Sequence, residues 1–148
     1  MPMQTAFLAT QTAAQNNLPI NAATTLTINN EVFDQNADYN AGTYTFTSPG
    51  TGRYQLNATV RLDDVDSASA YYRLNLVTSN QTFLYNHYPI EMTGDGTVSF
   101  MLSVICDMDA ADTAYVAIQI PNDGAAQADV GVDSGGFRQT FFSGALIC

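Results

Sequence analysis

Acidic side chains are the residues of this sequence whose types and spacing most directly suggest chemistry. Three carboxylates lie within four residues, at Asp63, Asp64 and Asp66, and two more follow at Glu91 and Asp95. Carboxylate oxygens are the ligands that calcium prefers in proteins. These five residues therefore form a hypothetical calcium site, and the alternative interpretation is a solvated acidic surface.

Enzymatic catalysis is the second kind of chemistry to consider, and the sequence offers little for it. A nucleophile that is activated by a histidine would have to use His87, the only histidine of the chain. The sequence contains no nucleophile elbow, no phosphate-binding glycine loop and no lysine. A structural role for His87 is the simpler interpretation. The sequence therefore predicts a protein that is not an enzyme, with no catalytic residue and no cofactor beyond the hypothetical calcium.

The charge balance excludes several partners. Four arginines stand against 14 acidic residues, which gives a net charge of -10. Such a surface repels nucleic acids and anionic membranes. No stretch approaches the ~20 apolar residues of a membrane span, so membrane insertion is not expected. The two cysteines, Cys106 and Cys148, either pair or serve as small apolar residues.

The elements that must position these residues are strands. Charged residues make up only 12% of the chain, about half the usual ~25%, which favours strands and turns over helices. Apolar residues alternate with polar ones in residues 53–62, 97–107 and 113–120. The first of these segments has on one face Tyr54, Leu56, Ala58, Val60 and Leu62. This period of two is typical of half-buried antiparallel strands.

Seven further short strands complete the expected fold. They are predicted at residues 5–10, 24–28, 32–34, 43–47, 69–78, 82–88 and 137–147, and residues 124–136 are the longest expected loop. Turn-forming segments such as Ser48-Pro49-Gly50-Thr51-Gly52 separate the strands. About ten short strands and no helix predict one all-β domain over residues 1–148, either a sandwich or a barrel.

An antiparallel fold also predicts where the acidic residues gather. Because each connection reverses the chain direction, alternate loops lie at the same end of the domain. The loop with Asp63, Asp64 and Asp66 then shares an end with Glu91 and Asp95. Three more acids join them there, namely Asp123, Asp129 and Asp133. We expect both chain termini at the opposite end.

A spaced pattern of residues in the first half of the chain resembles a known family. Asp34, Tyr39 and Phe46 are followed by the Gly-x-Tyr of Gly52 and Tyr54, with the spacing of the complement C1q/tumour-necrosis-factor-like domains. The start Thr5-Ala6-Phe7-Leu8-Ala9 and the end Phe141-Phe142-Ser143-Gly144-Ala145-Leu146 resemble the first and last strands of that family. Three positions depart from the pattern, because apolar residues replace aromatic ones at Ile28, Leu56 and Ala58.

The resemblance implies a ten-stranded, two-sheet jelly-roll sandwich that assembles as a homotrimer, with one sheet packed around the threefold axis. It would explain why several strands carry apolar residues on the face opposite to the core, which in a monomer would form an exposed patch. The trimer interface is therefore expected at Met101, Ile105, Phe141, Ala145 and Ile147. A slight misassignment of the faces is the alternative. The family's calcium ligands correspond to residues 86–91, where only Glu91 is acidic.

Two functions fit these features. The chain opens at Met1 without a secretory signal, so we expect synthesis in the cytoplasm. Together with a compact, acidic, self-trimerising domain, this favours a structural module on the surface of a virus particle, such as a phage head-decoration trimer or a fibre tip, with capsid or fibre proteins as partners. The alternative is a soluble or surface recognition module, extracellular in location, that binds a glycan or a protein at the acidic end with the help of calcium.

Overall fold

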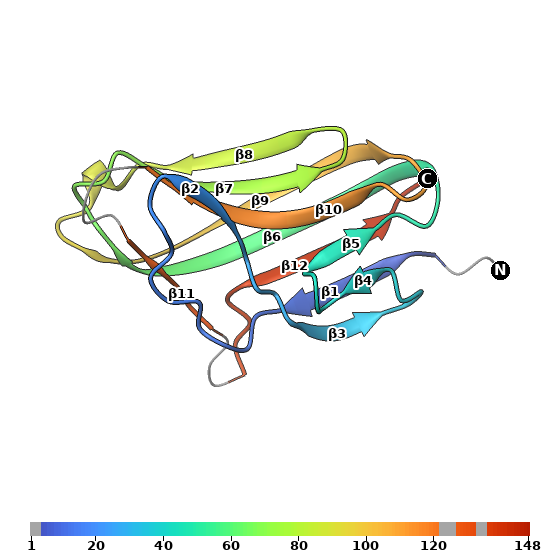
Figure 1. Cartoon of the computed structure of the whole chain (residues 1–148), viewed down its shortest axis with the longest axis horizontal. Coiled ribbons are helices and arrows are strands. Elements are labelled where there is room, and N and C mark those ends of the chain that lie inside the picture. Colours follow the sequence, from blue (N-terminus) through green and yellow to red (C-terminus); the bar gives the residue numbers. More distant parts are fainter. Residues whose placement is uncertain (1–3, 122–126, 133–135) are drawn as a thin grey trace.

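The computed structural model describes residues 4–121, 127–132 and 136–148, and these form a sandwich of two antiparallel sheets (Figure 1). Sheet A runs in the order β9, β6, β12, β1 and β3, and β11 pairs with β6 beyond the end of β12. Its strands are β1 (Ala6–Thr10), β3 (Asn30–Asp34), β6 (Gly52–Val65), β9 (Gly96–Met108), β11 (Asp129–Val130) and β12 (Phe141–Leu146).

Sheet B covers one face of sheet A. It runs in the order β8, β7, β10, β5 and β4, and β2 pairs with β10 beyond the end of β5. Its strands are β2 (Ala22–Thr25), β4 (Tyr39–Asn40), β5 (Thr45–Thr47), β7 (Tyr72–Thr78), β8 (Thr82–His87) and β10 (Thr113–Ile120). A 3-10 turn, η1 (Pro89–Glu91), follows β8. Within the described ranges, no helix is long and apolar enough to cross a membrane.

The ten predicted strands correspond to ten of the twelve described strands. The prediction for residues 113–120 matches β10 in full, whereas β6 and β9 each extend beyond their predicted bounds. The predicted strand at 24–28 is shifted, because β2 begins at Ala22 and ends at Thr25. The two-residue strands β4 and β11 were not expected, and β11 corrects the prediction that residues 124–136 form only a loop.

Alternation along the long strands builds the core between the sheets. The side chains at every second position of β6, from Tyr54 to Leu62, are fully buried, and those of β10 at Ala114, Val116, Ile118 and Ile120 meet them from sheet B. The predicted inward faces of β6 and β10 are therefore confirmed, whereas on β9 only Phe100 and Cys106 of the predicted face are buried and its other members are half-buried. Ile28, Leu56 and Ala58, where the family usually has aromatic residues, are also buried, so these substitutions keep the core apolar.

An aromatic cluster joins the two sheets near the chain termini. The ring of Phe7 stacks on Phe46 and Tyr39, with centroids 4.7 Å and 5.2 Å apart, and meets the edge of Phe142 at 5.0 Å. The hydroxyl of Tyr39 donates a hydrogen bond to the carbonyl of Ile28 at 2.7 Å. Four of the residues that carry the family resemblance, at positions 7, 39, 46 and 142, thus form one packed cluster.

Gly144 makes this packing possible. A Cβ atom at residue 144 would lie 2.6 Å from Cδ2 of Leu56 and 2.6 Å from Cε1 of Phe7, far inside contact distance. The absence of a side chain therefore lets Phe7 lie against β12.

We predict that Gly144→Ala lowers the free energy of unfolding by about 1–3 kcal/mol, because the added methyl group overpacks a close-packed core. Chemical denaturation measures the change. Gly94→Ala is the matched control, since its Cβ would meet nothing within 4 Å. Equal stability of the two variants would contradict the packing described for Phe7.

Candidate functional site

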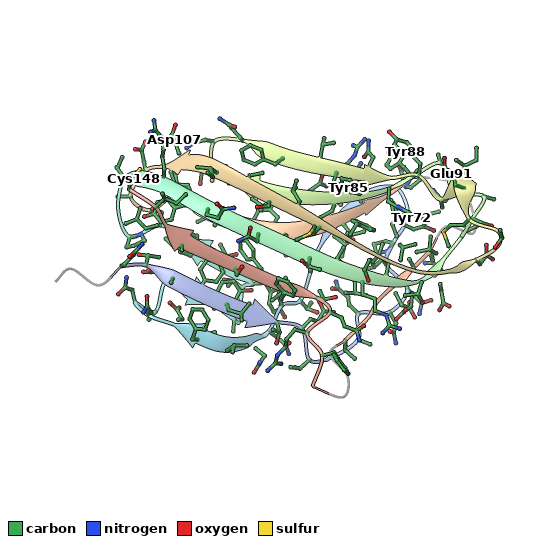
Figure 2. All side chains as sticks on the ribbon, turned by 180° about the vertical axis from the view of Figure 1, so that it is seen from behind. Tyr72, Tyr85, Tyr88, Glu91, Asp107 and Cys148 are labelled. Carbon is green, nitrogen blue, oxygen red and sulfur yellow. The ribbon has the colours of Figure 1, made fainter. Side chains whose placement is uncertain are left out.

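The face of sheet A that points away from the core is called here the A face, and it is turned towards the viewer in Figure 2. The register of its strands sets side chains in three rows. Cross-strand pairing sets Met101, Thr59 and Phe141 in one row and Ile105, Gln55 and Ala145 in another. The middle row consists of Ser103, Asn57, Ser143, Leu8 and Phe33. Residues that lie far apart in the sequence therefore form one continuous surface.

The three rows contain no ionisable side chain, although the protein has a net charge of -10. Along the strands, an ion pair lies beyond each of the two outer rows. Arg53 Nε lies 3.1 Å from Asp107 Oδ1 near the termini, and Arg61 Nη2 lies 2.9 Å from Asp63 Oδ1 at the other end. The A face is thus a neutral area on a strongly acidic molecule, and its borders are locally neutralised.

Apolar side chains on the A face are exposed to an unusual degree. Met101 is 60% exposed, Ile105 is 59% exposed, and Phe33 and Ile147 are each 48% exposed. Phe141 and Ala145 are half-buried. All five residues expected at a trimer interface lie on β9, on β12 or directly after β12. Leu8 and Phe33 were not expected on this surface, because only the pairing of β1 with β12 and β3 brings them there.

A second aromatic group lies where the edges of the two sheets meet. The edge strands β8 and β9 lie on the same side of the sandwich, and the imidazole of His87 stacks on Phe100 with centroids 5.6 Å apart and planes at 9°. Tyr85, which is 43% exposed, lies 5.7 Å from the same ring. Within the described part of the chain, His87 Nε2 is buried and has no hydrogen-bond partner.

The acidic loops gather at one end of the sandwich, as expected, and the termini lie at the other end (Figure 1). Asp63 is the cross-strand neighbour of Asp129 and accepts a 2.7 Å hydrogen bond from the hydroxyl of Thr97. The backbone N–H and the hydroxyl of Ser67 both donate to Asp95 Oδ1 at 2.9 Å, which lowers the pKa of that carboxyl. Two of the eight expected acids, Asp123 and Asp133, lie outside the described residues.

The described residues of this acidic end do not by themselves assemble a metal site. Among the described residues, no three His, Cys, Asp or Glu side chains converge as ligands of one ion. Asp66 accepts a hydrogen bond from the N–H of Ala68 at 2.8 Å, Asp64 lies in a β-bulge with φ 58°, and Glu91 lies in η1. A calcium site that includes these carboxylates stays a prediction.

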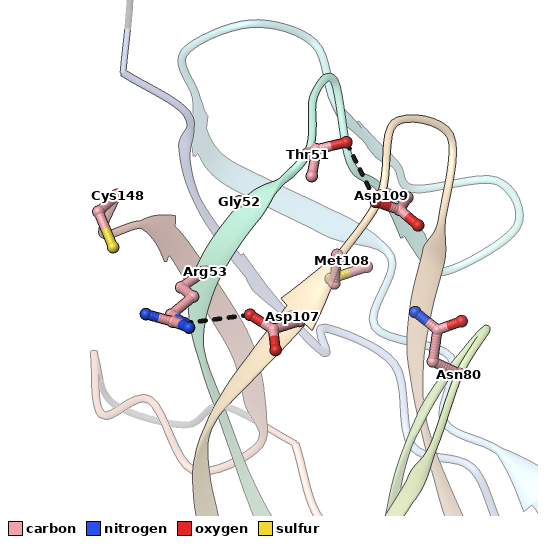
Figure 3. Close-up of a pocket in the computed structure, with 8 residues that line it drawn as sticks. All are labelled: Thr51, Gly52, Arg53, Asn80, Asp107, Met108, Asp109 and Cys148. Atoms are coloured by element: carbon pink, nitrogen blue, oxygen red, sulfur yellow. Dashed lines mark hydrogen bonds and ion pairs between the residues drawn. The ribbon is translucent and has the colours of Figure 1, made fainter.

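A hollow of about 410 Å³ lies at the end of the molecule with the termini (Figure 3). Its lining residues are Thr51, Gly52, Arg53, Asn80, Asp107, Met108, Asp109 and Cys148. Its charged side chains already have partners, because Arg53 pairs with Asp107 and the hydroxyl of Thr51 donates to Asp109 at 3.1 Å.

Both cysteines are free, Cys106 in the core and Cys148 exposed at this hollow. Burial raises the pKa of the Cys106 thiol, so it acts as a small apolar residue.

Known structures share this arrangement of strands. The globular domain of zebrafish complement 1qA protein is 15% identical, with a TM-score of 0.64 over 98% of this chain and 97% of that one. Murine APRIL at pH 8.5 is 12% identical, with a TM-score of 0.67 over 98% and 100% of the two chains. No family model and no curated protein matches the sequence. At these identities the likeness shows the fold, a jelly roll of the C1q/TNF type.

We predict that His87 makes the protein less stable at mildly acidic pH. Burial lowers the pKa of His87 below its ordinary value of about 6.5. The unfolded chain therefore binds a proton more readily than the folded one, and stability falls as the pH drops from about 6.5 towards the lowered pKa. In His87→Phe, which keeps a ring against Phe100, this loss should disappear. Urea denaturation at pH 7.5 and pH 5 measures it, and an unchanged pH dependence in the variant would contradict the prediction.

Proposed function

We propose that this chain, a jelly roll with the C1q/TNF-type fold, is a non-enzymatic interaction module that works as a homotrimer joined through the A face. The observation that carries the proposal is the neutral A face with its exposed Met101 and Ile105. Large apolar side chains that gather on one uncharged face commonly mark an interaction site, and burial of apolar area is the main favourable term in association.

Charge favours a second copy of the chain as the partner on this face. Two molecules with a net charge of -10 repel each other over most of their surfaces. They can approach closely only where the surface is neutral, and the three rows of the A face provide such an area. The family resemblance implies the threefold arrangement, in which this sheet packs around the axis.

The position of His87 supports a role without catalysis. A general base needs a ring nitrogen within hydrogen-bond reach of its substrate. In this structure Nε2 of His87 is buried and the ring stacks on Phe100. Its geometry fits packing at the sheet edges.

We predict that Met101→Glu and Ile105→Glu each convert the trimer to monomers, because each places three new charges in a buried interface. Sedimentation velocity measures the mass. Ile90→Glu is the matched control, since Ile90 is 83% exposed and lies in η1, away from the A face. A trimer that survives both changes on the A face would refute the proposed interface.

A finer proposal assigns this trimer to the surface of a virus particle, as a head-decoration trimer or a fibre tip. The positions of the two chain termini support this proposal (Figure 1). Both termini lie at one end, so an assembly that holds the trimer there presents the acidic end outwards. Mass spectrometry of purified particles tests this role. The chain should be found in stoichiometric amounts with the major capsid or fibre protein, and its absence from every such particle would contradict the proposal.

Recognition of a ligand at the acidic end is the second candidate, and a specific observation favours it. Tyr88 is 57% exposed and Ile90 is 83% exposed, and both lie beside Glu91 at the end away from the termini (Figure 2). Aromatic and apolar side chains of this kind commonly anchor ligands. A glycan array in calcium and in EDTA tests it: binding only with calcium would support a site that includes Asp63, Asp64, Asp66, Glu91 and Asp95, and no binding in either buffer would favour the purely structural role.

A further inference from the structure

We propose that a polar ladder in the middle of the A face, formed by Gln55, Asn57, Ser103 and Ser143, sets the register and the number of subunits in self-association. This inference rests on the proposed function, because it assigns a role to residues of the same face. It concerns specificity, which apolar contacts alone do not provide.

The ladder is a connected set of hydrogen bonds across three strands. The amide of Gln55 donates to Ser103 Oγ at 2.8 Å, and the Ser103 hydroxyl donates to Asn57 Oδ1 at 2.7 Å. Gln55 Nε2 also lies 3.3 Å from Asn57 Oδ1. Asn57 Nδ2 reaches Ser143 Oγ on the other side, at 3.5 Å. Strands β9, β6 and β12 are thereby linked by their side chains.

The middle row of the ladder, with Ser103, Asn57 and Ser143, lies between the two rows that contain the most exposed apolar residues of the face. Met101 and Phe141 lie on one side of Asn57, and Ile105 and Ala145 lie on the other. Any copy of the chain that covers the apolar rows must therefore cover the ladder as well.

Covering the ladder is favourable in few arrangements only. Gln55 Oε1 accepts no hydrogen bond from the described residues, and an Asn amide has two N–H groups, of which one makes only the long bond to Ser143. Buried polar groups without partners are costly. Registers that set the ladder of one copy against apolar side chains of another are therefore disfavoured, whereas a symmetric arrangement that brings ladders together satisfies these groups. A single buried Asn selects register and oligomeric state in coiled coils by the same physics.

The partner to which this inference commits is another copy of the chain. The ladder and its two flanking rows carry no charge, and the ion pairs Arg53–Asp107 and Arg61–Asp63 neutralise both borders. A second acidic chain meets no like charge on this surface.

The test is the double variant Asn57→Leu, Ser103→Ala, measured by native mass spectrometry over a hundredfold range of concentration. We expect the wild type to give one stoichiometry and the variant to give a mixture of two or more. The control makes the same two substitutions in the turn between β7 and β8, as Asn80→Leu, Ser79→Ala, where the side chains are exposed, and it should behave as the wild type. A uniform trimer for the double variant would overturn the role of the ladder and leave the proposed function intact. A monomeric wild type would overturn both.

A second variant covers the case in which the double variant does not fold. Asn57→Asp keeps the shape of the side chain and introduces an ionisable group into each subunit. If the ladders meet in the assembly, the carboxyls of the three copies lie close together in a buried interface, which raises their pKa above the ordinary value of about 3.9. The variant should therefore dissociate at pH 8 and reassemble near pH 4. The same trimer at both pH values would overturn the inference.

Discussion

The fold depends on how closely Phe7 approaches Gly144. This contact holds β1 against β12 and fills the space between the sheets with the rings of Phe46, Tyr39 and Phe142. Because a strand presents alternate residues to opposite faces, the register that buries Phe7 also decides which residues face outward. A slip of one residue would turn the apolar rows and the ladder inward. The A face is therefore a consequence of core packing on the other side of the same sheet.

Sequence periodicity predicted the long strands well because their pattern is local. In β6, β9 and β10 each second residue is apolar, and a period of two needs no knowledge of the partner strand. The short strands were harder. The two-residue strands β4 and β11 exist through their pairing with β5 and β6, and neither has a pattern of its own. The end of β6 was also missed, since the bulge at Asp64 interrupts its alternation.

The residues of the candidate site also differ in whether the sequence could predict them. The exposure of Met101 and Ile105 could be predicted, because apolar residues on the outer face of an alternating strand stand out in the sequence. The ladder could not, because it joins residues up to 86 positions apart and needs the register of three strands. The acidic residues were predicted to gather, and Asp63, Asp95 and Asp129 do lie at one end. Their oxygens are used by hydrogen bonds from Thr97, Ser67 and Asn17, which the sequence did not reveal.

The neutral A face is the centre of this account, and the mass of the wild-type protein in solution tests it most directly. Light scattering after size-exclusion chromatography, first in EDTA and then in calcium, gives that mass. We expect one species near three times 15.9 kDa in both buffers. A trimer that forms only with calcium would move the centre of assembly to the acidic end. A monomer in both buffers would contradict the account, because the exposed apolar rows would then have no partner of their own kind.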